Sequence, residues 1–383
     1  MQIEWLKGIH QCDENAWDKL NTTNNPFLKH CYFTALEKSA CTNTASGWEP
    51  HHLIVREEDG QMLAAMPLYI KYHSYGEYVF DWSWANAWRS CGLEYYPKLL
   101  TAVPFTPSTG PRILLTDQLT QEQTDSVYRT VIENLFERCK DGYSGWHILF
   151  PEKAVSDRLV EYGCLQRMGY QFHWFNRDYQ HFDDFTDSFT SRKRKNIKKE
   201  RARVKSQGFV FKQLRGTEID DALWQKFYTF YQLTYLKRSG HHGYLNLDFF
   251  RLIGQSMQDN LMMAIAIKDS EVVAAALNFV DSATLYGRYW GCLEEYDFLH
   301  FETCYYQGIE FCIREKLARF DAGAQGEHKI QRGFEPVPIW SNHLIRHNEL
   351  ADAIRDFLAQ EKLAVKNYLS DCKQVLPFNT FNR

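Results

Sequence analysis

Residues 59–69, DGQMLAAMPLY, recur 210 positions later in the chain as DSEVVAAALNF, residues 269–279. In each copy an apolar run precedes a D-G or D-S turn, and a strand of small apolar residues follows it. This order predicts a β-hairpin in both places. Because such self-similarity indicates one structural unit present twice, we expect two related domains, spanning residues 1–180 and 181–383.

Each half also carries a strand, an amphipathic helix and a further strand after its hairpin. In the first half the helix is expected within residues 116–139, where apolar residues repeat with helical spacing. These residues are Val127, Val131, Leu135 and Phe136. In the second half a strand at 285–291 leads into a helix at 301–317 and a strand at 319–324. We therefore expect an α/β (α+β) fold in which each domain is a mixed, mostly antiparallel sheet flanked by helices.

The composition is that of a globular protein. Of 383 residues, 44% are hydrophobic and 24% charged, which excludes the disordered, collagen-like and coiled-coil classes. The 10 cysteines are scattered singly without a CxxC pair, a usage typical of a reducing compartment. No apolar run approaches the length of a membrane span, and the N-terminus lacks a signal-like apolar segment. We expect a cytoplasmic protein without a membrane span, and the oligomeric state stays open.

The charge is concentrated in one segment. Residues 192–205, RKRKNIKKERARVK, hold nine basic residues and one acidic residue in a chain whose net charge is −4. The segment predicts a helix from Ser191 that ends before Gly208, and cations on it favour polyanion binding through counterion release. The residues predicted to bind the polyanion are Arg192, Arg194, Lys198, Arg201 and Lys205. The alternative is an ion-pair network that joins this helix to acidic faces of the same protein.

Seven stretches of the chain together resemble a known family. They are PFLKHCYFTALEKS (26–39), GWEPHHLIV (47–55), VFDWSWANAW (79–88), FTPSTGPR (105–112), LYGRYWG (285–291), HFETCYYQGIEFCI (300–313) and FDAGAQGEHKIQRGFEPV (320–337). The pattern resembles the FemAB-like predicted N-acyltransferases of the acetyltransferase (GNAT) superfamily, which are labelled peptidoglycan biosynthesis or recognition proteins. This resemblance implies two tandem GNAT-like domains.

The resemblance also implies a reaction. An acyl or aminoacyl group passes from an activated donor, aminoacyl-tRNA or acyl-CoA, to an amine acceptor, with peptidoglycan precursors as one acceptor class. Neither half shows the glycine-rich loop that binds a pyrophosphate before a helix, and the acidic stretch GCLEEYDFLHFE (291–302) stands at that place in the second half. No permanently bound cofactor and no metal site are expected. The alternative function is a non-catalytic protein of this fold that binds a polyanion through residues 192–205.

Acyl transfer to an amine requires a proton acceptor, an oxyanion contact and alignment of the two substrates. Titratable residues gather in the second half around GAQGEHK (323–329), near strand ends where ligands bind in α/β sheets. The predicted catalytic residues are Glu302, Asp321, Glu327, His300 and Lys329. Structural roles are the alternative: Glu302 lies in a first helical turn that favours a carboxylate, and Asp321 can bond N–H groups of its own turn.

Substrate contacts are predicted in both halves. Arg288 and Trp290 share one face of a strand, which suits an anionic ligand that stacks, or a cation–π pair on the sheet. Trp82 and Trp84 alternate on an expected strand that forms either core or the wall of an acceptor groove. The full set of predicted substrate-binding residues is Arg288, Trp290, Tyr305, Tyr306, Gln325, His328, Arg332, Trp82, Trp84 and Arg112.

Overall fold

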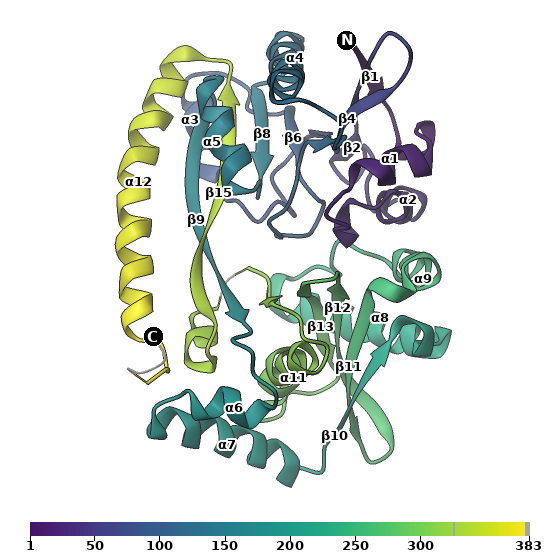
Figure 1. Cartoon of the computed structure of the whole chain (residues 1–383), viewed down its shortest axis with the longest axis vertical. Coiled ribbons are helices and arrows are strands. Elements are labelled where there is room, and N and C mark those ends of the chain that lie inside the picture. The colour runs from purple at the N-terminus through teal and green to yellow at the C-terminus, as the bar shows by residue number, and fades with distance from the viewer. Residues whose placement is uncertain (325, 380–383) are drawn as a thin grey trace. The chain divides into compact units, whose positions relative to one another are not determined.

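The computed structural model describes residues 1–324 and 326–379 and divides the chain into two compact units (Figure 1). Unit 1 consists of residues 1–170 and 338–368, and unit 2 consists of residues 171–337 and the C-terminal residues from 369. The predicted domain boundary after residue 180 stays a prediction. Within the described residues, no helix combines the length and the apolar character needed to cross a membrane.

Unit 1 contains two β-sheets with helices around them. Its strands are β1 (Gln2–Leu6), β2 (Trp48–Pro50), β3 (His52–Arg56), β4 (Met62–Met66), β5 (Tyr69–Lys71), β6 (Lys98–Thr101), β7 (Leu114–Leu115), β8 (Gly145–Leu149) and parts of β9 (Leu165–Phe175) and β15 (Glu335–Ile345). Its helices are α1 (Glu14–Leu20), α2 (His30–Lys38), α3 (Trp82–Ser90), α4 (Gln121–Cys139), α5 (Lys153–Glu161) and most of α12 (Asn348–Gln374). One sheet has the order β1-β3-β4-β7, and the other runs from β2 through β5, β6 and β8 to β15.

Helix α4 covers the core of unit 1. Thr120 caps its N-terminus in a capping box with Gln123, which satisfies two backbone N–H groups that the helix leaves unpaired. The helix buries Val127, Val131 and Leu135 against the strands, as its apolar spacing predicts. Phe136 was expected on the same face, but 46% of its surface is exposed. It lies 100° further round the helix than Leu135, outside the buried stripe.

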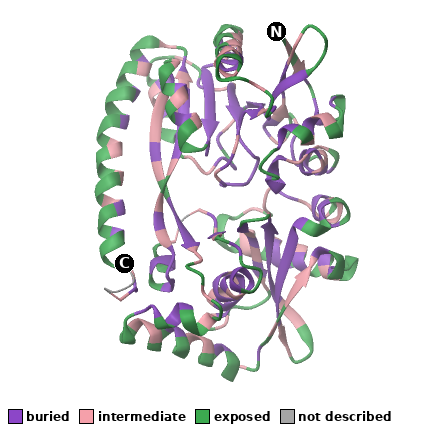
Figure 2. Ribbon diagram, viewed as in Figure 1, coloured by how far each residue is buried: buried purple, intermediate pink, exposed green. Residues whose placement is uncertain are grey.

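Unit 2 is built on one mixed sheet. Its strands are β10 (Val210–Arg215), β11 (Leu261–Lys268), β12 (Glu271–Val280), β13 (Thr284–Cys292), β14 (Arg319–Asp321) and the second part of β9. Its helices are α6 (Phe182–Asp187), α7 (Ser191–Ser206), α8 (Asp221–Ser239), α9 (Leu247–Ser256), α10 (Leu299–Phe301) and α11 (Gln307–Arg314). Strands β10 to β13 are antiparallel, β13 and β14 are parallel, and β9 closes the sheet antiparallel to β14. In Figure 2 the strands of this sheet are mostly buried, while α7 is largely exposed.

Both predicted hairpins are present. Strands β3 and β4 pair antiparallel with Val55 opposite Ala64, and β11 and β12 do so with Ala264 opposite Ala276. The repeated stretches therefore occupy equivalent hairpins, one in each unit.

The expected strand around Trp82 and Trp84 is wrong, because residues 82–90 form helix α3. Trp84 and Trp88 are buried with Ile345 and residues of α12, whereas Trp82 is exposed. The stretch WSWANAW carries an alternating pattern and a four-residue spacing at once. The four-residue spacing of Trp84 and Trp88 determines the structure as a helix, because Leu350, Ile354 and Leu358 of α12 form an apolar face for these two side chains to pack on.

The expected continuous helix at 301–317 is interrupted. Residues Glu302–Tyr306 form a π-helical segment between α10 and α11. The side chain of Gln307 donates to the Glu302 carboxylate, five residues earlier, at 2.9 Å, and this spacing matches the wider π turn. Such segments occur frequently at functional sites.

Gly291→Ala tests the close packing of α8 on β13. A Cβ atom at residue 291 would lie 2.2 Å from the carbonyl group of Phe230, so the helix must move away from the sheet. We expect the free energy of unfolding to fall by about 1–3 kcal/mol or more, measured by urea denaturation. Gly169→Ala is the control, because its Cβ meets only the side chain of Ile339, at 3.1 Å. Equal stability of the Gly291 variant and the wild type would contradict this packing.

Candidate functional site

Three side chains from separate segments of unit 2 meet near the carboxyl end of β13, and we call them the His–Tyr cluster: His300, Tyr305 and His328. The Tyr305 hydroxyl lies 2.8 Å from His328 Nε2. The ring centroid of His300 lies 5.3 Å from Tyr305 and 6.1 Å from His328. Trp290 of β13 also contacts His300, and the centroids of the two rings lie 5.3 Å apart. Residues 290, 300, 305 and 328 of the predicted site therefore come together.

Burial and neighbouring charges set the protonation states of the cluster. Burial and the charge of Arg238 lower the pKa of His300 to about 3. Burial and the charges of Lys329 and Arg332 lower the pKa of His328 to about 4. Both imidazoles are therefore neutral at pH 7 and hold a lone pair. Burial raises the pKa of Tyr305, so its hydroxyl keeps its proton and can donate it in a hydrogen bond. His328 is exposed and can reach a ligand.

Arg238 is a residue of this site that the sequence analysis missed. It lies exposed in the last turn of α8, before Gly240 ends the helix in the left-handed conformation at φ 71°. Its charge acts on His300, Tyr305 and His328. The available signal was the sequence KRSG, a basic pair at a helix C-terminus. An exposed guanidinium beside neutral proton acceptors suits an anionic substrate group.

Arg288 of β13 and Asp321 of β14 form a buried ion pair in the same unit. Arg288 Nη2 donates to Asp321 Oδ2 at 2.7 Å, and each side chain is 1% exposed. Burial opposes ionisation of Asp321, but the charges of Arg288 and His173 and the hydrogen bonds from Arg288 and the Gly323 N–H lower its pKa below its usual range. Asp321 is therefore a poor proton acceptor and Arg288 is already neutralised. Their contacts hold β13 to β14.

Lys329 and Arg332 hold the loop that presents His328. Lys329 Nζ donates to the carbonyl oxygens of Ala322 and Gly323 at 2.9 Å, and burial lowers its pKa to about 7. Arg332 donates to the carbonyl oxygen of His328 and to the carboxylate of Glu200, each at 2.7 Å. Both side chains are buried and act within the protein.

The remaining predicted site residues differ in their burial and in their hydrogen-bond partners. Glu302 is buried and accepts two hydrogen bonds from Arg201, at 2.8 and 3.0 Å. Tyr306 donates to Glu200, and buried Arg112 donates to the carbonyl oxygen of Leu149 at 2.9 Å. Glu327 is exposed, and Gln325 lies outside the described residues.

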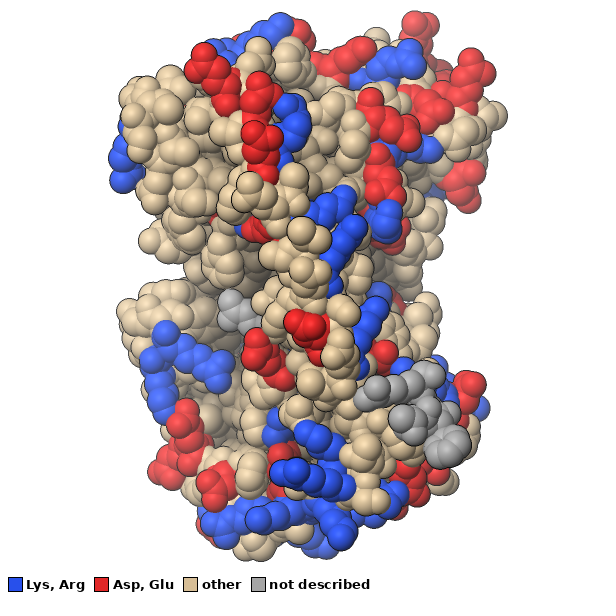
Figure 3. Space-filling view, turned by 90° about the vertical axis from the view of Figure 1, so that its left-hand side faces the viewer, with Lys and Arg blue, Asp and Glu red and all other residues tan. Residues whose placement is uncertain are grey.

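The predicted basic helix is α7, and its cations divide into two groups. Arg194 pairs with Asp187, Lys198 with Asp183 at 4.0 Å, Arg201 with Glu302 and Glu310, and Arg203 with Asp297, as the network alternative expects. Lys193 donates to the side chain of Gln331. The second group consists of Arg192, Lys195, Lys199 and Lys205. Within the described residues, no carboxylate lies at ion-pair distance from these four side chains. Lys and Arg side chains gather at the lower end of Figure 3, the end where Figure 1 shows α6 and α7.

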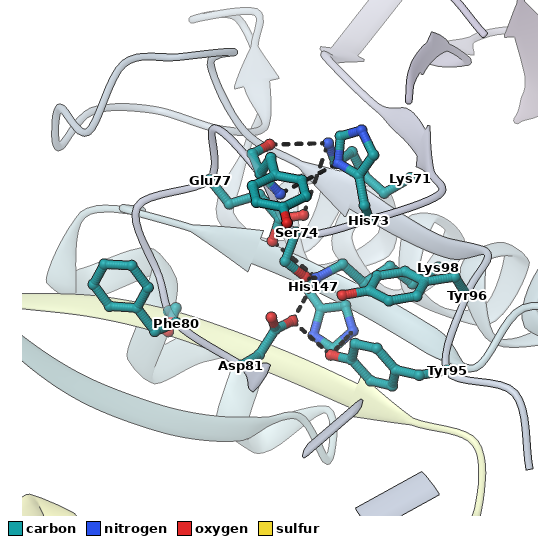
Figure 4. A network of polar contacts seen from close by, with 12 residues as sticks. Lys71, His73, Ser74, Glu77, Phe80, Asp81, Tyr95, Tyr96, Lys98 and His147 are labelled. Carbon is teal, nitrogen blue, oxygen red and sulfur yellow. Dashed lines mark hydrogen bonds and ion pairs between the residues drawn. The ribbon is translucent and has the colours of Figure 1, made fainter. Parts of the chain in front are cut away.

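Unit 1 contains a second cluster, which the sequence analysis missed: a buried network around Lys98 (Figure 4). Lys98 Nζ donates to Glu77 Oε2 at 2.8 Å and to Asp81 Oδ2. Lys71 Nζ lies 3.9 Å from Glu77 Oε1 and 3.7 Å from the ring centroid of Trp48. Each ionisable group of this network is 5% exposed or less. Buried charges are costly unless they are paired.

The network continues through hydrogen bonds towards β15. The Tyr95 hydroxyl donates to Asp81 at 2.7 Å and lies 3.4 Å from His147 Nε2. His147 Nδ1 lies 2.7 Å from His343 Nδ1. Burial lowers the pKa of Lys71 to about 6 and raises that of Glu77 to about 7. Groups with such perturbed pKa values are concentrated at functional sites. The sequence signal was weak, since the members lie far apart and only lysines within apolar strands mark them.

The family model for FemAB-like proteins, described as peptidoglycan biosynthesis/recognition, matches residues 8–380, so the chain belongs to the FemAB-like family. The predictions of the FemAB-like family and of a mixed α/β fold are confirmed.

Among solved structures, the chain is similar to FemX at 11% identity, with 93% of this chain and 100% of that chain covered and a TM-score of 0.53. It is also similar to a tandem GNAT protein from the clavulanic acid biosynthesis pathway, at 10% identity, 90% and 99% coverage and a TM-score of 0.49. L-PGS from Bacillus licheniformis gives 10% identity, 86% and 95% coverage and a TM-score of 0.48. No curated protein matches the chain in sequence.

Lys71→Met tests whether this lysine is neutral in the folded protein. Its folded pKa of about 6 lies below the ordinary value of 10.5, so between these values the unfolded chain binds an extra proton and wild-type stability rises with pH. The variant lacks this proton. We expect the wild type to gain up to about 1.4 kcal/mol per pH unit relative to the variant between about pH 8 and 10. Urea denaturation at each pH measures the difference, and a pH-independent difference would contradict the prediction.

Proposed function

We propose that this protein transfers an aminoacyl group from aminoacyl-tRNA to an amine acceptor, and that the acceptor is a peptidoglycan precursor. The observation that carries the proposal is the His–Tyr cluster, which combines a neutral, exposed imidazole with a protonated hydroxyl. The family description supports an acceptor related to peptidoglycan.

The chemistry follows from the hydrogen bond between the Tyr305 hydroxyl and His328 Nε2, which lie 2.8 Å apart. With hydrogen on Nε2, His328 donates to the Tyr305 oxygen, which leaves Nδ1 to accept a proton from the attacking amine. The Tyr305 hydroxyl hydrogen is then free to bond the oxyanion that develops on the ester carbonyl. A carbon–nitrogen bond forms and the ester carbon–oxygen bond breaks. The leaving ribose hydroxyl takes the proton from His328, which returns to its neutral state.

The surroundings of the cluster favour tRNA over coenzyme A as donor. The loop between β13 and α10 carries Glu294, Glu295 and Asp297, and α10 is only three residues long before the π segment. An acidic loop and so short a helix cannot cradle a pyrophosphate as a long helix N-terminus does. The exposed cations of α7, in the same unit, suit the phosphates of an RNA.

A cytoplasmic location is part of the proposal, because aminoacyl-tRNA is made and used there. All ten cysteines are free thiols, which agrees with a reducing compartment.

His328→Ala and Tyr305→Phe test the catalytic roles. We expect His328→Ala to lower kcat by about 10²-fold or more through loss of the proton acceptor, and Tyr305→Phe to lower it about 10-fold or more. The assay follows label from aminoacyl-tRNA, or in parallel from acetyl-CoA, to a peptidoglycan precursor with a free amine. His242→Ala, at an exposed histidine outside the cluster, is the matched control. Full turnover of both site variants would overturn the roles, and transfer from acetyl-CoA alone would overturn the donor.

Charge reversal on α7 tests the tRNA contact. The variant carries Arg192→Glu, Lys195→Glu and Lys199→Glu. We expect its tRNA affinity to fall by about 10-fold or more and its dependence on salt to weaken, because fewer counterions are released. Filter binding between 50 and about 200 mM salt measures both. The control reverses three exposed lysines of unit 1, Lys19, Lys38 and Lys140. Unchanged affinity would exclude this contact, whereas tRNA binding without transfer of any label favours the non-catalytic alternative.

A further inference from the structure

A pocket of about 560 Å³ lies beneath α7 in unit 2, between α6, β10 and the π segment. This volume is within the range of small-molecule sites. Its wall is mainly hydrocarbon and includes Phe182, Ile197, Val204, Phe209, Val210 and Phe211. The apolar wall of this pocket has no part in the proposed aminoacyl transfer, although the lining also includes the predicted site residues Lys198, Arg201, Lys205 and Glu302.

The polar side chains of the wall bond one another. Glu302 is paired with Arg201 and accepts a hydrogen bond from Gln307, and the Thr186 hydroxyl donates to the carbonyl oxygen of Asp183. Groups that are already satisfied offer little to a sugar or a base edge, which need hydrogen bonds of their own. The wall therefore suits an aliphatic chain.

The rim of the pocket is cationic. Lys198, Arg201, Ala202 and Lys205 line it and share one face of α7 by their spacing of three and four residues. Lys198 lies 4.0 Å from exposed Asp183, a loose pair. Among the described residues, no carboxylate lies at ion-pair distance from Lys205. Val210 of the opposite wall is 59% exposed, so an apolar surface and two available ammonium groups stand together at the opening.

We propose that this pocket binds a fatty acid, with the hydrocarbon chain against the apolar wall and the carboxylate between Lys198 and Lys205. Charge complementarity selects the anionic head, because the exposed charges of the rim are mainly positive. Burial of the hydrocarbon chain against the apolar wall supplies the affinity. The site goes beyond the proposed aminoacyl transfer and does not depend on it.

Titration calorimetry of the full chain with dodecanoate tests the proposal. We expect Lys198→Glu with Lys205→Glu to weaken binding by about tenfold or more. The matched control reverses two exposed cations that lie about 100° or more round the same helix from Lys198 and Lys205, Arg192→Glu with Lys199→Glu, and should bind dodecanoate as the wild type does. That control pair belongs to the tRNA contact proposed above, so the two double variants separate the two proposals.

Two further measurements test the chemistry of the ligand and the position of its chain. Dodecyltrimethylammonium, with the same chain and a cationic head, should bind at least about tenfold more weakly than dodecanoate. Ala202→Trp, at an exposed position of the rim, should block the chain, and its circular dichroism melt shows whether it is folded. Equal binding of both amphiphiles, equal binding by the Lys198/Lys205 variant, or no dodecanoate binding would overturn the proposal. Binding of anionic phospholipid vesicles without dodecanoate binding would also overturn it, in favour of a membrane surface.

Discussion

The organisation of unit 2 depends on the ion pair between Arg201 of α7 and Glu302 at the start of the π segment. Two hydrogen bonds join the guanidinium to a carboxylate that is almost wholly buried, and Gln307 bonds the same carboxylate. A buried carboxylate without its partner would be strongly destabilising. The pair therefore anchors α7, supports the π turn that presents Tyr305, and forms one wall of the pocket beneath the helix.

Burial and pairing also distinguish the side chains that support the site from those that can contact a ligand. Asp321, Lys329 and Arg332 have charges or protons that suggest chemistry, but each is buried and bonded within unit 2. His328 combines exposure with a neutral lone pair and a hydroxyl neighbour. A site of this kind needs both groups, since the buried ones give the exposed ones a defined geometry.

The regular elements were largely predictable, and the exceptions have physical reasons. The spacing in α4 and the small-residue hairpins follow local rules, because each element buries one face. Residues 82–88 satisfy two periods, and only the apolar face of α12, more than 250 residues later, selects the helix. The π segment likewise depends on Arg201, about 100 residues earlier in the chain. In unit 1, the pairing of strands that are distant in the sequence brings Lys71 and Lys98 together with His147 and His343, and no local pattern reveals this.

By itself the sequence determined the family, the repeated hairpins, the charged helix and the segment that holds the His–Tyr cluster. These features are local, since composition and spacing over a few residues define them. Only the tertiary structure decided which titratable groups are paired and which are available, and it added Arg238, the Lys98 network and the pocket beneath α7. Burial and partnership depend on residues far apart in the chain, and they set the pKa and the accessibility of each group.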